Sequence, residues 1–175
     1  MDPVHAHLIL NHIPVVGLGA ALLLLLYAIA RKSDEMKKAA LAGFVLLALV
    51  AIPVFLTGKA AEDPAEHLPG VFESFIEQHE EAATAALIAI EVLGAVSLAG
   101  LVLTRRSKAL PKWFATILLF ASLGVAGVMT WTANLGGQIR HTEIRTGASN
   151  AGAPDGEAEE DHEREKQERK KREDH

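Results

Sequence analysis

Histidine is the residue type in this sequence best suited to chemistry, because imidazole binds metal ions and haem iron and titrates near neutral pH. The chain has eight histidines and no cysteine. Six of them stand near the ends of four apolar segments, residues 8–30, 39–56, 82–103 and 113–133; they are His5, His7, His12, His67, His79 and His141. They flank the start of the first and third segments or the end of the second and fourth. Since consecutive spans alternate in direction, these ends share one side, and the cluster predicts a metal or haem site there.

The four apolar segments predict an all-α integral membrane protein folded as a four-helix bundle. Crossing the hydrocarbon of a bilayer takes roughly 20 apolar residues; three segments reach that length, and residues 39–56 are short but uncharged. A soluble bundle would carry charged residues along its outer face, and residues 18–30 and 39–56 carry none. We expect residues 1–146 to form one transmembrane domain and residues 147–175 a charged C-terminal tail, either helical or disordered.

Lysine and arginine are distributed unevenly between the two sides of the predicted bundle. The connections after the first and third segments carry Arg31, Lys32, Lys37, Lys38, Arg105, Arg106, Lys108 and Lys112. The connection on the other side, residues 57–81, carries only Lys59. The charged tail begins too far from the last span to have a strong effect on the orientation in the membrane. Because positively charged loops stay in the cytoplasm, we expect a multi-pass protein of the bacterial inner membrane with both termini in the periplasm.

Capping residues and prolines predict where the helices begin, bend and end. Asp2, ahead of a proline, is a helix-start signal, so the first helix should begin well before the apolar segment. Pro14 should kink that helix just beyond His12. Thr57 and Gly58 predict the end of the second helix, and a proline at position 111 predicts the start of the fourth.

His12 and His79 are the two histidines that we expect to bind haem iron. His12 lies about four residues inside the first apolar segment, or ~6 Å along a helix, where a polar ring needs a partner within the protein. His79 precedes the third segment, whose alanine-rich start leaves room for a bulky group or for close helix packing. His5 and His7 are better explained as a water-wetted helix start, and His67 as a loop residue.

His141 and Arg140 follow the fourth segment and form a reserve site. If the helix continues past Gly136 and Gly137, a flat macrocycle could approach the glycine backbone. His141 could then replace one axial ligand, and Arg140 could pair with a propionate. If the glycines end the helix instead, His141 is a surface residue. The sequence leaves both alternatives open.

Glu91 lies near the centre of the third apolar segment and is the only charged residue within it. An ionised carboxylate at that depth is costly, so Glu91 should be protonated or partnered inside the bundle. Candidate partners are Ser97, Thr130 and Thr132. Proton movement and a structural hydrogen bond are both open, and the second is favoured because no other buried acid could form a relay.

Among metal centres, a b-type haem requires the fewest protein ligands. A di-iron bundle needs a Glu-x-x-His pair on each of two helices, and no such pair recurs. Zinc takes three or four ligands, which the acidic residues around His67 and His79 could supply, so zinc or copper is the alternative. A haem needs only one or two axial histidines, and the lack of cysteine excludes iron–sulfur clusters and cysteine-attached haem.

The segment HLILNHIP, residues 7–14, resembles the His-Pro-x-x-Val-His-Phe-Pro opening of a bacterial family of four-span membrane proteins of unknown function. The spacing of His7, His12 and Pro14 is kept. In that family a Thr-Gly-like turn with a downstream acid follows the second span and a histidine precedes the third; Thr57, Gly58, Glu62 and His79 occupy those places here. The resemblance covers residues 1–133, and it implies the same bundle and related positions for His12 and His79 but no established activity.

The function expected from this pattern is electron transfer by a small membrane cytochrome. One b-type haem would carry electrons between the quinone pool and a periplasmic redox partner. The alternative is an accessory subunit or a divalent-metal-binding membrane protein, within a larger membrane complex or a homo-oligomer. We expect no catalytic residue of a stand-alone enzyme and no nucleic-acid partner; the lipid bilayer is the partner that the composition itself predicts.

Overall fold

The computed structural model describes residues 2–105 and 109–145, and in these residues all regular structure is helical. The helices are α1 (Pro3–Leu10), α2 (His12–Ala30), α3 (Asp34–Glu66), α4 (Glu73–Thr104), α5 (Lys112–Arg140) and a short 3-10 helix, η1 (Thr142–Ile144). The chain divides after Arg140 into two units, of which the first holds α1–α5 and the second, which begins at His141, contains η1. The predicted tail, Arg106 and Lys108 lie outside the described residues.

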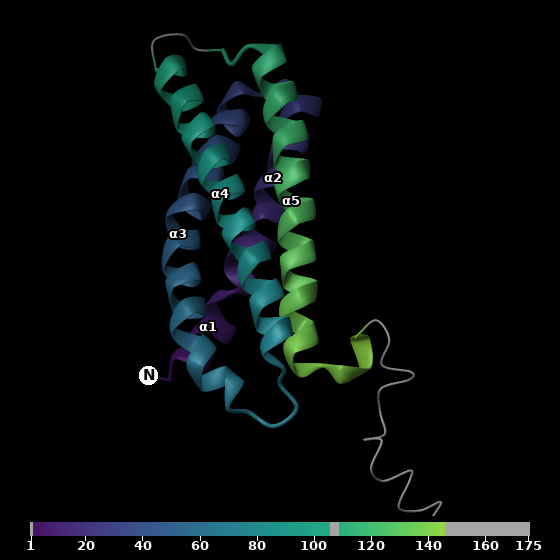
Figure 1. Cartoon of the computed structure of the whole chain (residues 1–175). Helices are drawn as coiled ribbons and strands as arrows, with labels where there is room; N and C mark the ends of the chain where they lie inside the picture. Colours follow the sequence, from purple (N-terminus) through teal and green to yellow (C-terminus); the bar gives the residue numbers. More distant parts are fainter. Residues whose placement is uncertain (1, 106–108, 146–175) are drawn as a thin grey trace, which may run out of the picture. The chain divides into compact units, whose positions relative to one another are not determined.

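Helices α1 and α2 run one after the other and share a single span, so the first unit is a bundle of four helical columns (Figure 1). Helix α3 packs between α2 and α4, and α5 packs against both α4 and α2. The first column and α4 therefore face each other diagonally across the bundle axis. We call the end of the bundle where α1 and α4 begin and α3 and α5 end the histidine end; it is the lower end in Figure 1.

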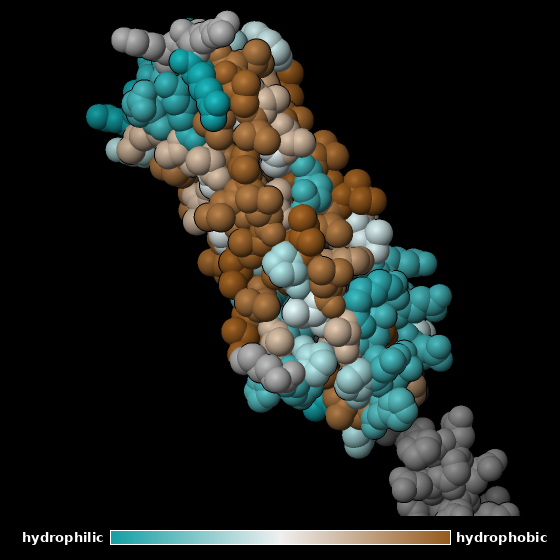
Figure 2. Space-filling view, turned by 90° about the vertical axis from the view of Figure 1, so that its left-hand side faces the viewer, coloured by the Kyte–Doolittle hydropathy of each residue, from teal (hydrophilic) through white to brown (hydrophobic). Residues whose placement is uncertain are grey.

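All four columns are long and apolar enough to cross a membrane. Large apolar side chains fill the interior, with Leu25, Phe44, Ile90 and Leu118 fully buried. The outside is apolar as well, since Leu23, Leu46, Ile88 and Phe120 are more than half exposed. Figure 2 shows this apolar surface along the middle of the bundle and hydrophilic residues toward its ends. The chain is thus a multi-pass membrane protein with an all-α four-helix bundle, as predicted.

The start of the first column follows the predicted capping chemistry. Oδ1 of Asp2 accepts a hydrogen bond from the backbone N–H of Val4 at 3.1 Å, and a proline occupies the first turn. The column is interrupted at Asn11, slightly before the expected kink. Pro14 has no N–H to donate to the carbonyl of Leu10, so the hydrogen-bond ladder cannot continue through this turn.

The prediction that Thr57 and Gly58 end the second helix is wrong. Helix α3 continues to Glu66, because residues 59–66 are rich in helix-forming Ala, Glu and Lys. Gly58 instead provides room for the ring of His7, which approaches the backbone there. Helix α5 likewise continues through its two glycines to Arg140.

Gly94 brings α3 and α4 close together and offers a test of the bundle packing. A Cβ atom at Gly94 would lie 2.5 Å from the Cβ atom of Ala48, so the helices would have to move apart. We expect Gly94→Ala to lower the free energy of unfolding by about 1–3 kcal/mol, as overpacking does.

The control is Gly124→Ala, because no atom lies within 4 Å of a Cβ there. Alanine at 124 should be neutral or stabilising by up to about 1 kcal/mol. Denaturant titration in detergent micelles measures both, and equal stabilities would contradict the close α3–α4 contact.

Candidate functional site

Two half-buried histidines, His7 of α1 and His79 of α4, meet across the axis of the bundle. Their ring centroids are 6.4 Å apart and their planes are inclined by 70°. Two imidazoles on opposite sides of one metal ion would have centroids roughly 6 Å apart, because each metal–nitrogen bond is about 2.0–2.1 Å long. The separation of the two rings is therefore compatible with one metal ion held between them.

Helix α3 holds the ring of His7. Its Nδ1 lies 3.2 Å from the carbonyl oxygen of Val54 and 3.5 Å from Oγ1 of Thr57. A Cβ atom at Gly58 would lie 3.0 Å from Cε1 of the ring. In a helix the Cβ atom tilts toward the preceding turn, so a side chain at 58 would shield the carbonyl of Val54. Glycine leaves that carbonyl open to the imidazole, in addition to its own helical partner and the hydroxyl of Thr57, which donates to it at 2.7 Å.

Helix α5 holds the ring of His79 in the same way. Its Nδ1 lies 3.0 Å from the carbonyl oxygen of Thr132, and a Cβ atom at Gly136 would lie 2.9 Å from Cε1. Thr132 and Gly136 are again one helical turn apart. The hydroxyl of Thr132 also donates to the carbonyl of Ala82 at 3.1 Å, which fixes α5 against α4 close to His79. Helices α3 and α5 thus each place a backbone carbonyl and, one turn later, a glycine against one imidazole.

These contacts determine which ring nitrogen of each histidine is available. A carbonyl oxygen can only accept a hydrogen bond, so Nδ1 must carry the proton in both rings. The described residues provide no hydrogen bond to Nε2 of either histidine. Metal-binding histidines show this pattern, in which one ring nitrogen is fixed by a carbonyl and the other presents its lone pair.

His12, the predicted partner of His79, has a different environment. Its side chain is exposed, and Nδ1 lies 3.2 Å from the carbonyl of Leu8 in the preceding turn. Five residues separate His7 from His12, which corresponds to roughly 140° of rotation around a helix, so the two rings leave different faces. The structure brings His7, rather than His12, against His79. Sequence reasoning identified one member of the pair and undervalued the other.

The remaining histidines make local contacts. His5 is exposed, and Nδ1 of His67 bonds to the carbonyl of Asp63, four residues earlier, at 2.7 Å. His141 is exposed, and its Nδ1 lies 2.8 Å from Oε1 of Glu143. The pKa of Glu143 lies below its ordinary value because its own backbone N–H and then the His141 ring hydrogen-bond to the carboxylate. Arg140, the last residue of α5, is exposed.

Charged side chains join α3 and α4 at the level of the two histidines. Lys59, next to Gly58, pairs with Glu80, next to His79, and with Glu62 at 3.8 Å. These groups pair with one another rather than forming a ligand set. Among residues 2–105 and 109–145, no group of three or more His, Asp or Glu side chains is placed to hold a metal ion.

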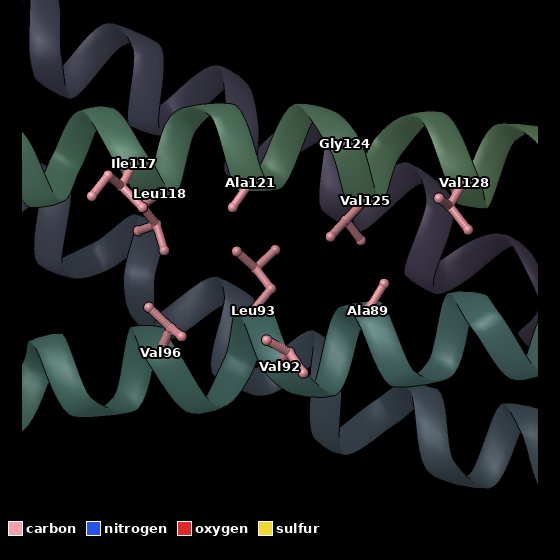
Figure 3. Close-up of a pocket in the computed structure, with 10 residues that line it drawn as sticks. All are labelled: Ala89, Val92, Leu93, Val96, Ile117, Leu118, Ala121, Gly124, Val125 and Val128. Carbon is pink, nitrogen blue, oxygen red and sulfur yellow. The ribbon is translucent and has the colours of Figure 1, made fainter.

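A groove of about 400 Å³ lies between α4 and α5, toward the middle of the bundle (Figure 3). Ala89, Val92 and Val96 of α4 face residues of α5 that include Leu118, Ala121 and Val125. Every lining residue is apolar, so the groove supplies no side chain that could bind a metal or transfer a proton.

Comparison with known proteins finds no matching family model, no curated relative and no similar solved structure. The resemblance of residues 7–14 to a four-span family therefore stays a prediction. The function is inferred from the geometry of the described residues.

Proposed function

We propose that this chain is a small b-type cytochrome whose single haem is bound between His7 and His79. The observation that carries the proposal is the pair of imidazoles 6.4 Å apart, each with Nδ1 fixed on a backbone carbonyl of a neighbouring helix. This arrangement leaves Nε2 of each ring without a hydrogen bond from the described residues, so both atoms are available to bind iron. The ligand pair differs from the one expected from the sequence by the exchange of His12 for His7.

The number of protein ligands favours haem over a bare metal ion. A structural zinc site takes four protein ligands and a catalytic site three, but only two side chains are gathered here, and no larger group occurs among the described residues. A porphyrin supplies four nitrogens itself, so two histidines complete the coordination. When bound, haem supplies one-electron chemistry.

Small residues lie near the two histidines along α3, α4 and α5, which suits a bulky planar group. Gly58 and Gly136 lie directly against the rings. Ala61, Ala82 and Ala86 are buried residues of α3 and α4 within two turns of the pair. These residues would flank the macrocycle, and Arg140, one turn beyond Gly136, would pair with a propionate.

The distribution of positive charge supports a location for the haem. With the arginine- and lysine-rich connections in the cytoplasm, the histidine end faces the periplasm of a bacterial cell. His7 and His79 would hold the haem at that end, where it would supply one-electron chemistry between the quinone pool and a periplasmic redox partner.

Optical and magnetic spectra of the purified chain, expressed with ample haem, test this function. We expect one haem per chain and a reduced-minus-oxidised spectrum typical of a low-spin haem with two histidine ligands. Because the ring planes are inclined by 70°, the oxidised protein should give the strongly anisotropic low-spin electron paramagnetic resonance signal of nearly perpendicular imidazoles. Absence of Soret absorption would overturn the proposal, as would stoichiometric zinc or copper without porphyrin.

A further inference from the structure

Glu91 stands in the middle of α4, far from any charge that could balance it. Its side chain is half-buried, Oε1 is fully shielded, and that atom has no hydrogen-bond partner among the described residues. Its neighbours Ile88 and Val92 are 60% and 58% exposed on the apolar surface of the span. The carboxyl group therefore lies at the margin between the bundle and the surrounding hydrocarbon.

The hydroxyl groups that could have satisfied Glu91 are engaged elsewhere. Ser97 donates to the carbonyl of Leu93 at 2.7 Å. Thr130 donates to the carbonyl of Ala126 at 2.8 Å, and Thr132 donates to carbonyls of α4 and α5. The structural hydrogen bond favoured from the sequence thus finds no partner in the described part of the chain.

No opposite charge faces Glu91 from the helices packed against α4. Residues 39–58 of α3 and residues 113–139 of α5 contain no titratable or charged side chain. Within α4 itself, residues 82–104 contain no other. The nearest such groups along these helices are Lys38, Lys59, Glu81, Arg105, Lys112 and Arg140, which lie toward their ends.

We propose that Glu91 is a proton-binding site within the hydrocarbon region. An isolated carboxylate in an apolar medium costs so much free energy that the group takes up a proton instead. Its ligand is the proton, exchanged reversibly at the exposed margin of α4. This inference is independent of haem binding, since Glu91 lies about three turns of α4 from His79.

A hydrophobic carbodiimide tests the proposal because it reacts with protonated carboxyl groups inside membranes. The acid O–H adds across one C=N bond of dicyclohexylcarbodiimide, and the adduct rearranges to a stable N-acylurea that retains every atom. With the full chain in lipid vesicles at pH 7, we expect one adduct per chain, located at Glu91 by peptide mass spectrometry.

Two variants provide the controls. Glu91→Gln should lose the adduct and also the infrared carbonyl stretch of a protonated carboxylic acid. Glu80→Gln should keep both, because Glu80 is paired with Lys59 outside the apolar region. The proposal is overturned if Glu91 stays unlabelled, or if the infrared band is absent from the unmodified protein or persists in Glu91→Gln. Either result leaves the haem proposal unaffected, because that is tested by haem spectra alone.

Discussion

Replacing His7 by alanine is expected to abolish low-spin haem binding, whereas replacing His12 by alanine should leave it intact. His7 lies across the bundle axis from His79, with the ring centroids 6.4 Å apart, while His12 is exposed and bonds to the carbonyl of Leu8 in the preceding turn. Loss of one axial ligand removes six-coordination, so His7→Ala and His79→Ala should both lose the low-spin spectrum and most of the bound haem. The measurement is the haem-to-protein ratio with the reduced-minus-oxidised spectrum of each purified variant.

Two controls separate lost ligation from lost folding. Circular dichroism should show unchanged helix content in all three variants, because only exposed or half-buried side chains are shortened. Added imidazole should restore part of the low-spin spectrum of His7→Ala, since the removed ring leaves space beside Gly58. Loss of haem from His12→Ala, with retention in His7→Ala, would refute the ligand pair.

The membrane fold could be predicted from the sequence because its main determinant is local. A long uncharged run must form a helix in hydrocarbon, whatever else the chain does. The capping role of Asp2 is equally local and was predicted correctly. Gly58 was misread because its role depends on His7, a residue of another helix, which no pattern around position 58 reveals.

Only one of the two histidines of the candidate site was predicted from the sequence, because the position of the other depends on packing against another helix. His79 was identified from its place before an apolar segment. His12 was preferred to His7 because it lies deeper in the first apolar segment, but depth does not determine which face of a helix a ring occupies. Asn11 interrupts the column between the two histidines, and the face that each one takes is set by packing on α3.

One sequence signal could have identified His7. The ends of the second and fourth spans each carry a glycine four residues after a position whose carbonyl receives an imidazole, Val54 with Gly58 and Thr132 with Gly136. Gly58 was interpreted as a helix terminator, and Gly136 either as a terminator or as room for a flat macrocycle. A glycine can also expose a backbone carbonyl, and each of these two carbonyls receives an imidazole.

Replacing Gly136 by alanine is expected to weaken haem binding about 10- to 100-fold, the usual cost of disturbing a group that orients a metal ligand. The added Cβ atom would lie 2.9 Å from Cε1 of His79, so the ring must move away from the carbonyl of Thr132. Nδ1 of His79 would lose its hydrogen-bond acceptor, and the ring would no longer hold Nε2 in a fixed orientation. Gly58→Ala should act in the same sense on His7 but less strongly, because the corresponding distance is 3.0 Å.

The matched control for Gly136→Ala is Gly127→Ala on the same helix, where no atom lies within 4 Å of a Cβ. For Gly58→Ala it is Gly43→Ala, whose Cβ would make an ordinary contact of 3.4 Å with Ala21. Haem titration of each variant, followed at the Soret band, gives the relative affinities. A general effect of alanine on the spans would weaken all four variants alike. A response confined to Gly58→Ala and Gly136→Ala requires that the carbonyls of Val54 and Thr132 orient the two rings, because the added methyl groups touch the imidazoles only there.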